Sequence, residues 1–249
     1  MVPMGSQKKG IVVYATDLHG EIHAYERLLE MGSGKNVRAV IIGGDIAPFL
    51  TAMGDIALYQ REFFKHYLIP RMLEFRKRTR KNVFIMMGND DLKVNLGMLE
   101  EAEKKGAFKI MNQKVHRIGS KFVAGYTYVN ETPFLLKDWE RPEGRIGRDL
   151  YSMAKLADPK KTIYVTHAPP YGTHLDVVFS GSHVGSTAIM KFIMDAQPHL
   201  TLHGHIHESY QMTGVWREML GKTVSVNPGK QNILVFDADN LKTMEILSA

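Results

Sequence analysis

Five short apolar runs recur along the chain, and they restrict its fold more than any other feature of the sequence. Each run has five residues, most of them β-branched, aromatic or aliphatic, so the runs are too short for buried helices and are typical of strands. Because they are continuously apolar rather than alternating, we expect strands that are covered on both faces. The runs lie at residues 11–15, 39–43, 83–87, 162–166 and 199–203.

Amphipathic helical patterns lie between or after these runs. Residues 20–32 repeat apolar positions at helical spacing and end at a glycine. Residues 56–78 form a longer candidate, in which Pro70 predicts a bend, and residues 184–195 form a third. Strands that alternate with helices predict an α/β fold.

Two segments, 115–128 and 210–247, follow a different pattern, with strand-like pieces separated by turn signals. We expect these pieces to pair antiparallel, so the sheet should be mixed. No linker rich in glycine and serine divides the 249 residues, so we expect one domain over residues 1–249, with residues 1–9 as a flexible N-terminal segment.

The composition is that of an ordinary globular protein, with 44% hydrophobic and 23% charged residues. No apolar run approaches the length of about 20 residues that a membrane span needs. The N-terminus lacks the apolar core of a signal peptide, and the chain has no cysteine. These features favour a cytoplasmic protein. Because there is no cysteine, any metal must be held by His, Asp, Glu or Asn.

The net charge of +6 is a mild basic bias that is compatible with phosphate-bearing ligands. The densest basic run covers residues 71–82. We interpret it as a solvated helix end, where cations offset the negative end of the helix dipole. A nucleic-acid patch is the less favoured alternative, because aromatic residues do not interleave usefully with these charges.

A side chain that can bind a metal follows each apolar run almost at once. In an open α/β sheet, ligands bind beyond the carboxyl ends of the strands, so we expect these side chains to converge on one edge. In order along the chain they are Asp17 and His19, Asp45, Asn89 and Asp90, His167, and the triplet His203, His205 and His207.

Each of these residues also has a purely structural interpretation when it is taken alone. Asp17 could cap the helix that starts near Gly20, and the two Gly-rich turns before Asp45 and Asp90 could be simple strand-to-helix connections. A lone His167 could be a hydrogen-bonded structural residue, and the three alternating histidines could form a polar strand face. Coincidence at five successive strand ends is much less plausible than one shared metal site.

The sequence resembles the calcineurin-like metallophosphoesterase superfamily, and most closely its small prokaryotic members. The resemblance rests on five blocks in a fixed order, with a late turn after them: "DLH" (17–19), "GGD" (43–45), "GND" (88–90), "THAPP" (166–170), "GHIH" (204–207) and "NPG" (227–229). It implies a sandwich of two mixed β-sheets flanked by helices, with a site for two metal ions inside it.

The resemblance also implies a ligand set for each ion. Two residues have distinct roles: Asp45 would bridge both ions, and His203 would have only a supporting or structural role. The first ion would be held by Asp17, His19, Asp45 and His207, and the second by Asp45, Asn89, His167 and His205.

Two divalent cations are suited to phosphate-ester hydrolysis because they bind phosphoryl oxygens and generate a metal-activated hydroxide. With two carboxylates and that hydroxide, the site keeps a net charge of about +1, which favours an anionic substrate. Mixed nitrogen and oxygen ligands suit manganese, iron, zinc, nickel or cobalt. Manganese is the first expectation by analogy with the family.

One position departs from the family pattern. Asp90 stands where the family commonly has a histidine that contacts the phosphate and protonates the leaving group. An aspartate of ordinary pKa is a poor proton donor at neutral pH. We therefore take Asp90, Asn89 and His167 as the candidate catalytic residues, and predict slow turnover of esters with poor leaving groups. His183 and His174 are further candidates for the proton donor, although both can be plain loop histidines.

We thus expect a metal-dependent phosphoesterase that acts on a small phosphate ester, with phosphodiesters slightly ahead of monoesters. A nuclease of the same superfamily is one alternative, although nucleic acid is not the favoured partner. A scaffold on the same fold that has lost catalysis is another, and the absence of histidine at residue 90 is its best support. The sequence leaves the oligomeric state open.

Overall fold

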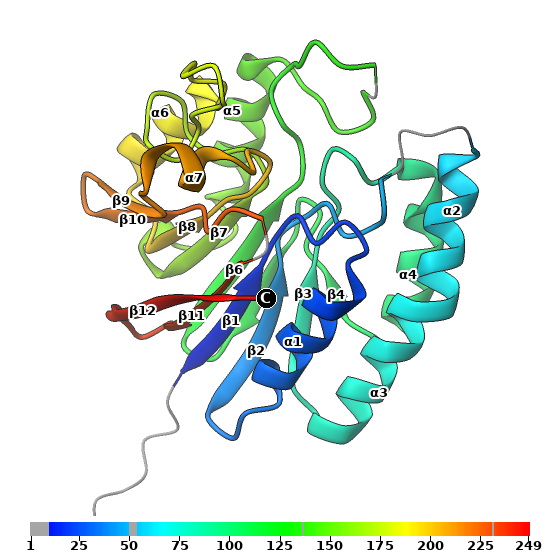
Figure 1. The fold of residues 1–249 in the computed structure, drawn as a ribbon. Helices are drawn as coiled ribbons and strands as arrows, with labels where there is room; N and C mark the ends of the chain where they lie inside the picture. The colour runs from blue at the N-terminus through cyan, green and yellow to red at the C-terminus, as the bar shows by residue number, and fades with distance from the viewer. Residues whose placement is uncertain (1–9, 50–53, 136, 231) are drawn as a thin grey trace, which may run out of the picture.

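Two six-stranded β-sheets face each other in the computed structural model, which describes residues 10–49, 54–135, 137–230 and 232–249 (Figure 1). The first sheet has the order β12-β11-β1-β2-β3-β4 and the second the order β5-β6-β7-β8-β10-β9. The strands of the first sheet are β1 (Ile11–Ala15), β2 (Val37–Ile42), β3 (Asn82–Ile85), β4 (Lys109–Ile110), β11 (Asn232–Asp237) and β12 (Asn240–Ser248). Those of the second are β5 (Val115–Ile118), β6 (Lys121–Tyr126), β7 (Thr162–Thr166), β8 (Leu200–Leu202), β9 (Arg217–Leu220) and β10 (Thr223–Val226).

Both sheets are mixed, as expected. Strands β1 to β4 run parallel, β11 pairs antiparallel with β1, and β12 pairs antiparallel with β11. In the second sheet β6, β7, β8 and β10 run parallel, whereas β5 and β9 pair antiparallel with their neighbours. The predicted α/β sandwich is therefore confirmed.

Helices cover the outer face of each sheet, so the central strands are buried on both sides (Figure 1). Val12 and Tyr14 of β1 pack between the sheets, while Val13 and Ala15 pack under the helices. This alternation explains why the run at 11–15 is apolar throughout. The helices are α1 (Ile22–Gly32), α2 (Ile56–Phe63), α3 (Ile69–Thr79), α4 (Leu96–Lys104), α5 (Glu143–Met153), α6 (Thr187–Ala196) and the short α7 (Ser209–Thr213).

The long helical pattern at 56–78 forms α2 and α3, which are joined by a π-helical turn, Phe64–Leu68. The sequence predicted a bend at Pro70, but the structure instead has the π-helical turn just before Pro70. Proline has no amide hydrogen and its ring collides with the carbonyl four residues earlier, so the turn before it widens. In that turn the amide of Ile69 donates to the carbonyl of Phe64, five residues back.

The other differences concern where elements begin. The helix expected at 184–195 starts at Thr187, because Ser186 caps it and accepts a hydrogen bond from the amide of Ile189. Helices α4, α5 and α7 were not predicted from the sequence, and α7 (Ser209–Thr213) occupies the start of the segment 210–247 that was expected to be strand-like. The expectation for residues 1–9 concerns a segment outside the described residues. Within the described part of the chain, no helix is both long and apolar enough to cross a membrane.

Candidate metal centre

Loops from both sheets bring the candidate ligands together. The loops after β1, β2 and β3 come from the first sheet, and those after β7 and β8 come from the second. Backbone hydrogen bonds join the β1 and β2 loops, from the amide of Asp17 to the carbonyl of Gly44 (3.0 Å), and the β7 and β8 loops, from Gly204 to His167 (2.9 Å). The expectation that all five strand ends share one sheet edge is therefore wrong: two sheets contribute, and their edges meet.

Four side chains form the tighter part of the site. One donor atom each from Asp17, His19, Asp45 and His207 lies within 4.8 Å of all the others. The Nε2 atom of His207 lies 3.3 Å from Oδ1 of Asp17, and Nε2 of His19 lies 3.9 Å from Oδ2 of Asp45. These are the four residues predicted to hold the first ion.

The remaining candidates lie next to this group. The Nε2 atom of His167 lies 3.2 Å from Oδ2 of Asp45 and 3.0 Å from Oδ1 of Asn89. The ring of His205 lies 5.4 Å from that of His167 between centroids. Asp17 also lies near these residues, since its Oδ1 atom is 3.9 Å from Nε2 of His167.

The chemistry of these side chains fits divalent metal ions. The Nε2 atoms of His19 and His207 face each other at 3.2 Å, which requires a proton or a cation beside the two lone pairs. The Nδ1 atom of His19 is buried and has no hydrogen-bond partner among the described residues. Imidazole, carboxylate and amide donors together suit first-row transition metals.

Backbone strain is concentrated in the same loops. Asp17, His19, Asp45 and His205 have φ angles of 54°, 43°, 49° and 66°, in the left-handed region that side chains with a Cβ rarely adopt. They are four of the seven non-glycine residues with positive φ among the described residues. Each such residue costs about 1–3 kcal/mol, and this kind of strain clusters at functional sites.

Two glycines allow the loops to approach closely. A Cβ at Gly88 would lie 2.2 Å from Oδ1 of Asp45, and one at Gly204 would lie 2.4 Å from Oδ2 of Asp17. Neither position tolerates a side chain without displacing a candidate ligand. This explains why glycine precedes both Asn89 and His205 in the sequence.

Comparison with known proteins identifies the family. A family model described as calcineurin-like phosphoesterase matches residues 12–209, which is most of the chain. The chain belongs to the calcineurin-like phosphoesterase family. All the candidate ligands, from Asp17 to His207, lie within the matched range.

Similar proteins align with nearly the whole of this phosphoesterase-family chain. Uncharacterized protein MJ1162 of Methanocaldococcus jannaschii is 29% identical over 241 residues, which are 95% of this chain and 94% of that protein. One crystal structure aligns with a TM-score of 0.72 at 18% identity, over 96% of this chain and 99% of that one. The crystal structure of TT1561 from Thermus thermophilus aligns with a TM-score of 0.67 at 16% identity, over 96% and 98%. At these identities the two structures show a shared fold.

Burial and neighbouring charges shift the pKa values of the candidate ligands. Burial raises the pKa of Asp17 and of Asp45, but the neighbouring histidines outweigh burial and lower both. Burial lowers the pKa of His167, yet Asp45 and Asp17 raise it to about 10. Burial dominates at His205 and lowers its pKa to about 4. A cation bound at this site must displace the proton of His167, so metal binding is coupled to proton release.

Asp90, at the position that departs from the family pattern, is partly enclosed by the site. Its amide donates to Oδ1 of Asp45 (2.9 Å), and its carboxylate accepts from Nδ2 of Asn89 (2.8 Å). Burial, together with the charge of Asp45, raises the pKa of Asp90 to about 7. The ordinary aspartate pKa expected for Asp90 from the sequence is therefore wrong for the protein without bound metal.

Asp91 is a supporting residue that sequence reasoning missed. Its buried carboxylate accepts hydrogen bonds from the amides of Ile46 (3.0 Å), Ala47 (2.8 Å) and Gly88 (2.8 Å). It thereby ties the loop that carries Asp45 to the loop that carries Asn89. The doubled aspartate at residues 90 and 91 was the only signal in the sequence.

Asp17 does not have the structural role that was considered for it, whereas His203 does have a structural role. The cap expected of Asp17 is wrong, because no side chain caps α1 and the Asp17 carboxylate accepts from the amide of His205 (3.0 Å). His203 is fully buried and bonds through Nδ1 to Oγ1 of Thr166 (2.8 Å) and through Nε2 to Oγ1 of Thr201 (2.9 Å). Its contacts are those of a structural residue.

The two alternative proton donors each pair with a carboxylate. His174 lies 3.2 Å from Glu218, and its side chain is 60% exposed. His183 lies 2.7 Å from Asp176, a fully buried carboxylate that also accepts from three backbone amides of its own loop. Neither histidine bonds to a candidate ligand in the described part of the chain.

Proposed function

We propose that the chain is a metal-dependent phosphoesterase with a dinuclear centre that hydrolyses small phosphate esters, and phosphodiesters slightly better than monoesters. The observation that carries the proposal is the convergence of Asp17, His19, Asp45 and His207, whose donor atoms lie within 4.8 Å of one another. Membership of the calcineurin-like phosphoesterase family supports the same class of reaction.

The assignment of ligands to two ions follows from how the side chains are grouped. The first ion would be held by Asp17, His19, Asp45 and His207, and the second by Asp45, Asn89, His167 and His205. When bound, two divalent cations, with manganese as the first candidate and iron, zinc, nickel or cobalt as alternatives, supply Lewis acidity and lower the pKa of a water.

The side chains of the protein would bind the ester and hold the ligands in position. Asp17 and Asp45 supply the only negative charges among the proposed ligands, so two dications leave a positive charge that favours an anionic ester. His167 is held in place by the carbonyl of Gly43, which lies 3.0 Å from its Nδ1 atom and leaves Nε2 to face Asp45 and Asn89. Asn89 and Asp90 lie beside each other and would contact the phosphate or an attacking water.

Asp90 limits the range of leaving groups. Two bound dications would lower its pKa below the value of about 7 that burial and Asp45 produce. The carboxyl would then be ionised at neutral pH and would not donate a proton. Esters with good leaving groups are therefore the better substrates.

A chromogenic substrate panel crossed with a metal panel tests the proposal. The substrates are bis-p-nitrophenyl phosphate, p-nitrophenyl phosphate and single-stranded DNA, each with manganese, iron, zinc, nickel or cobalt. We expect metal-dependent hydrolysis that is fastest on the diester and abolished by EDTA. Faster cleavage of DNA would identify a nuclease, and no hydrolysis with any of the five metals would indicate a scaffold.

A further inference from the structure

A buried carboxylate fixes the orientation of one histidine in the loop between β7 and α6. Asp176 is fully buried, and its carboxylate accepts hydrogen bonds from three backbone amides of this loop, at distances of 2.9–3.1 Å. Its Oδ1 atom also lies 2.7 Å from Nδ1 of His183, whose side chain is 40% exposed. Because the carboxylate is the acceptor in this pair, Nδ1 donates. The imidazole ring of His183 is thus open to solvent while its orientation is held from the buried side.

Tyr171 forms a corner with this histidine. The two ring centroids lie 6.0 Å apart with an angle of 62° between the ring planes, and Tyr171 is 46% exposed. Rings at such an angle form two adjoining walls, so a planar ring that stacks on one of them can turn its edge toward the face of the other. We call the side chains of Tyr171 and His183 the aromatic corner.

The backbone beneath the aromatic corner is restrained. Tyr171 follows Pro169 and Pro170, whose rings fix their φ angles. The amide of Tyr171 donates to the carbonyl of Ser186 (3.1 Å), and the amide of Ser186 donates to the carbonyl of Pro169 (2.9 Å). A ligand that binds exposed rings on a restrained backbone loses little affinity to the ordering of a loop, which is the property of a preorganised binding site.

Two connections place the aromatic corner beside the candidate metal centre. Tyr171 is the fourth residue after His167, so their Cα atoms are at most about 14 Å apart even in a fully extended chain. In the same loop, the carbonyl of Leu175 accepts from the buried Nδ2 atom of Asn227 (3.0 Å). That Nδ2 atom also donates to the carbonyl of Ile206 (3.2 Å), which lies between two candidate ligands. The corner is therefore fixed to the loops after both β7 and β8.

A nucleoside ester matches both the corner and the metal centre. Its phosphate is the anion that two dications favour, and its base is a planar ring with a π face that stacks on aromatic side chains. The sugar separates the phosphate from the base, as the loop separates the corner from the ligands. An alkyl group would instead lie against the polar edge of an imidazole that Asp176 holds in place, which favours a planar polar ring over hydrocarbon.

We propose that the aromatic corner of Tyr171 and His183 binds a nucleobase, so that the preferred substrates are phosphodiesters of nucleosides. This inference rests on the proposed function and names its substrate class. Base stacking tolerates different bases, because every base has a π face, so the corner selects for a base without selecting strongly among bases. Neither side chain takes part in bond breaking.

Two diesters with the same leaving group test the proposal, thymidine 5′-(p-nitrophenyl phosphate) and ethyl p-nitrophenyl phosphate, both assayed with manganese. We expect kcat/KM to favour the thymidine ester by about tenfold, mainly through KM, which is within the range that base stacking contributes. Tyr171→Ala and His183→Ala should each remove most of this preference, whereas Tyr171→Phe keeps the ring and should keep the preference. Tyr59→Ala is the matched control, because Tyr59 is a tyrosine of α2 that is 47% exposed. No preference in the wild type, or an equal loss on both esters in Tyr171→Ala, would overturn the proposal.

Calorimetry provides a second readout that does not depend on turnover. The manganese-loaded protein is titrated with thymidine 5′-monophosphate and with 2-deoxyribose 5-phosphate, which lacks only the base. We expect the nucleotide to bind about tenfold more tightly to the wild type and to Tyr59→Ala, and both ligands to bind equally to Tyr171→Ala. If neither diester is hydrolysed but the nucleotide binds more tightly through Tyr171, the proposed function fails while the nucleobase site stands. Hydrolysis of both diesters with equal kcat/KM supports the proposed function and overturns the nucleobase site.

Discussion

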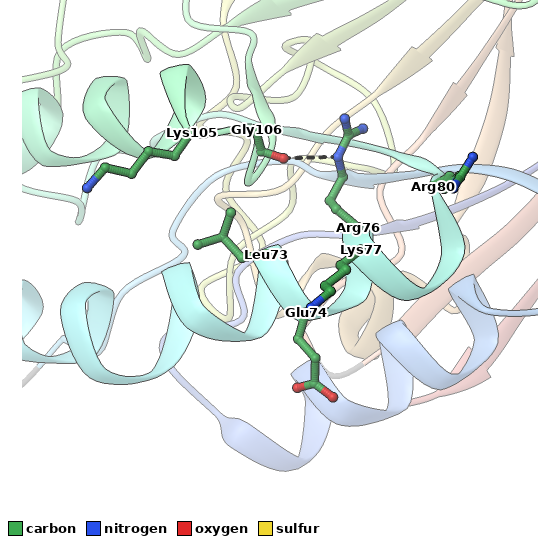
Figure 2. Close-up of a pocket in the computed structure, with 7 residues that line it drawn as sticks. All are labelled: Leu73, Glu74, Arg76, Lys77, Arg80, Lys105 and Gly106. Carbon is green, nitrogen blue, oxygen red and sulfur yellow. Dashed lines mark hydrogen bonds between the residues drawn. The ribbon is translucent and has the colours of Figure 1, made fainter.

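Two charged regions of the molecule differ in how their charges are arranged. The candidate metal centre collects residues that are up to 190 positions apart, from Asp17 to His207, and buries both of its carboxylates. The basic pocket at the ends of α3 and α4 collects neighbours in sequence and exposes most of them. Its lining residues are Leu73, Glu74, Arg76, Lys77, Arg80, Lys105 and Gly106 (Figure 2).

The charges of the basic pocket do not converge. Figure 2 shows Lys105 and Arg80 at opposite ends of the pocket with their charged ends turned away from each other. Arg76 is already bonded, through Nε to the carbonyl of Gly106 (3.1 Å) and through Nη1 to that of Lys81 (3.0 Å). The last turn of α3 carries Arg76, Lys77 and Arg78, and the bonds of Arg76 go to carbonyls outside that helix.

The difference shows that burial and convergence distinguish a site better than charge density does. The basic run is the most conspicuous charge feature of the sequence, yet its cations are either exposed, as Lys77 is, or bonded nearby, as Arg76 is. The metal centre has fewer charges, but they face one another with little water to screen them. If this contrast is correct, equal chemical changes should have large effects in one region and small effects in the other.

The largest expected effect is that of Asp45→Asn. Asp45 bridges both ions in the proposed assignment, so its replacement by an amide would remove a negative charge that offsets both of them. We expect kcat/KM for bis-p-nitrophenyl phosphate to fall about a thousandfold, which corresponds to several kcal/mol of lost electrostatic stabilisation. Arg80→Ala is the control from the basic pocket and should retain the wild-type rate. Comparable losses in both variants would remove the distinction between the regions.

The second prediction concerns the pH dependence of stability through His203. Burial lowers the pKa of His203 to about 4 from its ordinary 6.5, so its contribution is complete above pH 6.5 and is lost as the pH falls toward 4. A shift of this size contributes up to about 3 kcal/mol to the free energy of unfolding. Urea titrations in EDTA at pH 7 and pH 4.5 should show a steeper decline for the wild type than for His203→Gln. An equal loss of stability between pH 7 and pH 4.5 in the two proteins would contradict the role of His203. The control variant Lys105→Ala should lose as much stability as the wild type.

The third prediction is that Asp91→Asn weakens metal binding without touching a ligand. Asparagine has one acceptor oxygen where aspartate has two, and its amide group would face backbone amides that also donate. The loops carrying Asp45 and Asn89 would lose their shared anchor, and we expect manganese affinity to fall about 10–100-fold by calorimetry. Glu101→Gln, at an exposed carboxylate of α4 paired with Lys104, is the matched control. An unchanged affinity in Asp91→Asn would show that the loops are held by other contacts.

The fourth prediction tests the departure at residue 90. Asp90→His restores a group that can donate a proton to the leaving oxygen, and general acid catalysis contributes at least about 10²-fold when it is well placed. We expect kcat for alkyl esters to rise about tenfold, because a transplanted residue recovers part of that effect. Esters of p-nitrophenol should change little, and Asp90→Asn should give no gain. Unchanged or reduced turnover of alkyl esters in Asp90→His would rule out the missing acid as the limit.

The sequence was sufficient for the elements whose patterns are set locally. The run at 11–15 is apolar throughout because Val12 and Val13 are buried on opposite faces, and that is visible from composition alone. The convergence of Asp17, Asp45 and His207 also followed from their positions after strands. That two sheets rather than one supply the loops was not predicted, because strand order depends on long-range packing.

Sequence patterns failed where a residue acts through the backbone of a distant loop. Asp91 bonds to the amides of Ile46 and Ala47, about 45 positions away, and nothing near Asp91 reveals those partners. The pKa of Asp90 depends on burial and on Asp45, neither of which a reference value includes.

The smallest expected effect belongs to the basic pocket. Lys77 and Lys105 are exposed and line the pocket without a carboxylate partner among the described residues, so Lys77→Ala combined with Lys105→Ala removes two charges at little structural cost. We expect the free energy of unfolding to change by less than about 0.5 kcal/mol, as for most surface substitutions. The ratio of single-stranded DNA cleavage to bis-p-nitrophenyl phosphate hydrolysis should also stay unchanged. A selective fall in DNA cleavage would instead mean that the pocket guides a polyanion toward the metal centre, and exposed charge would then matter as much as buried charge.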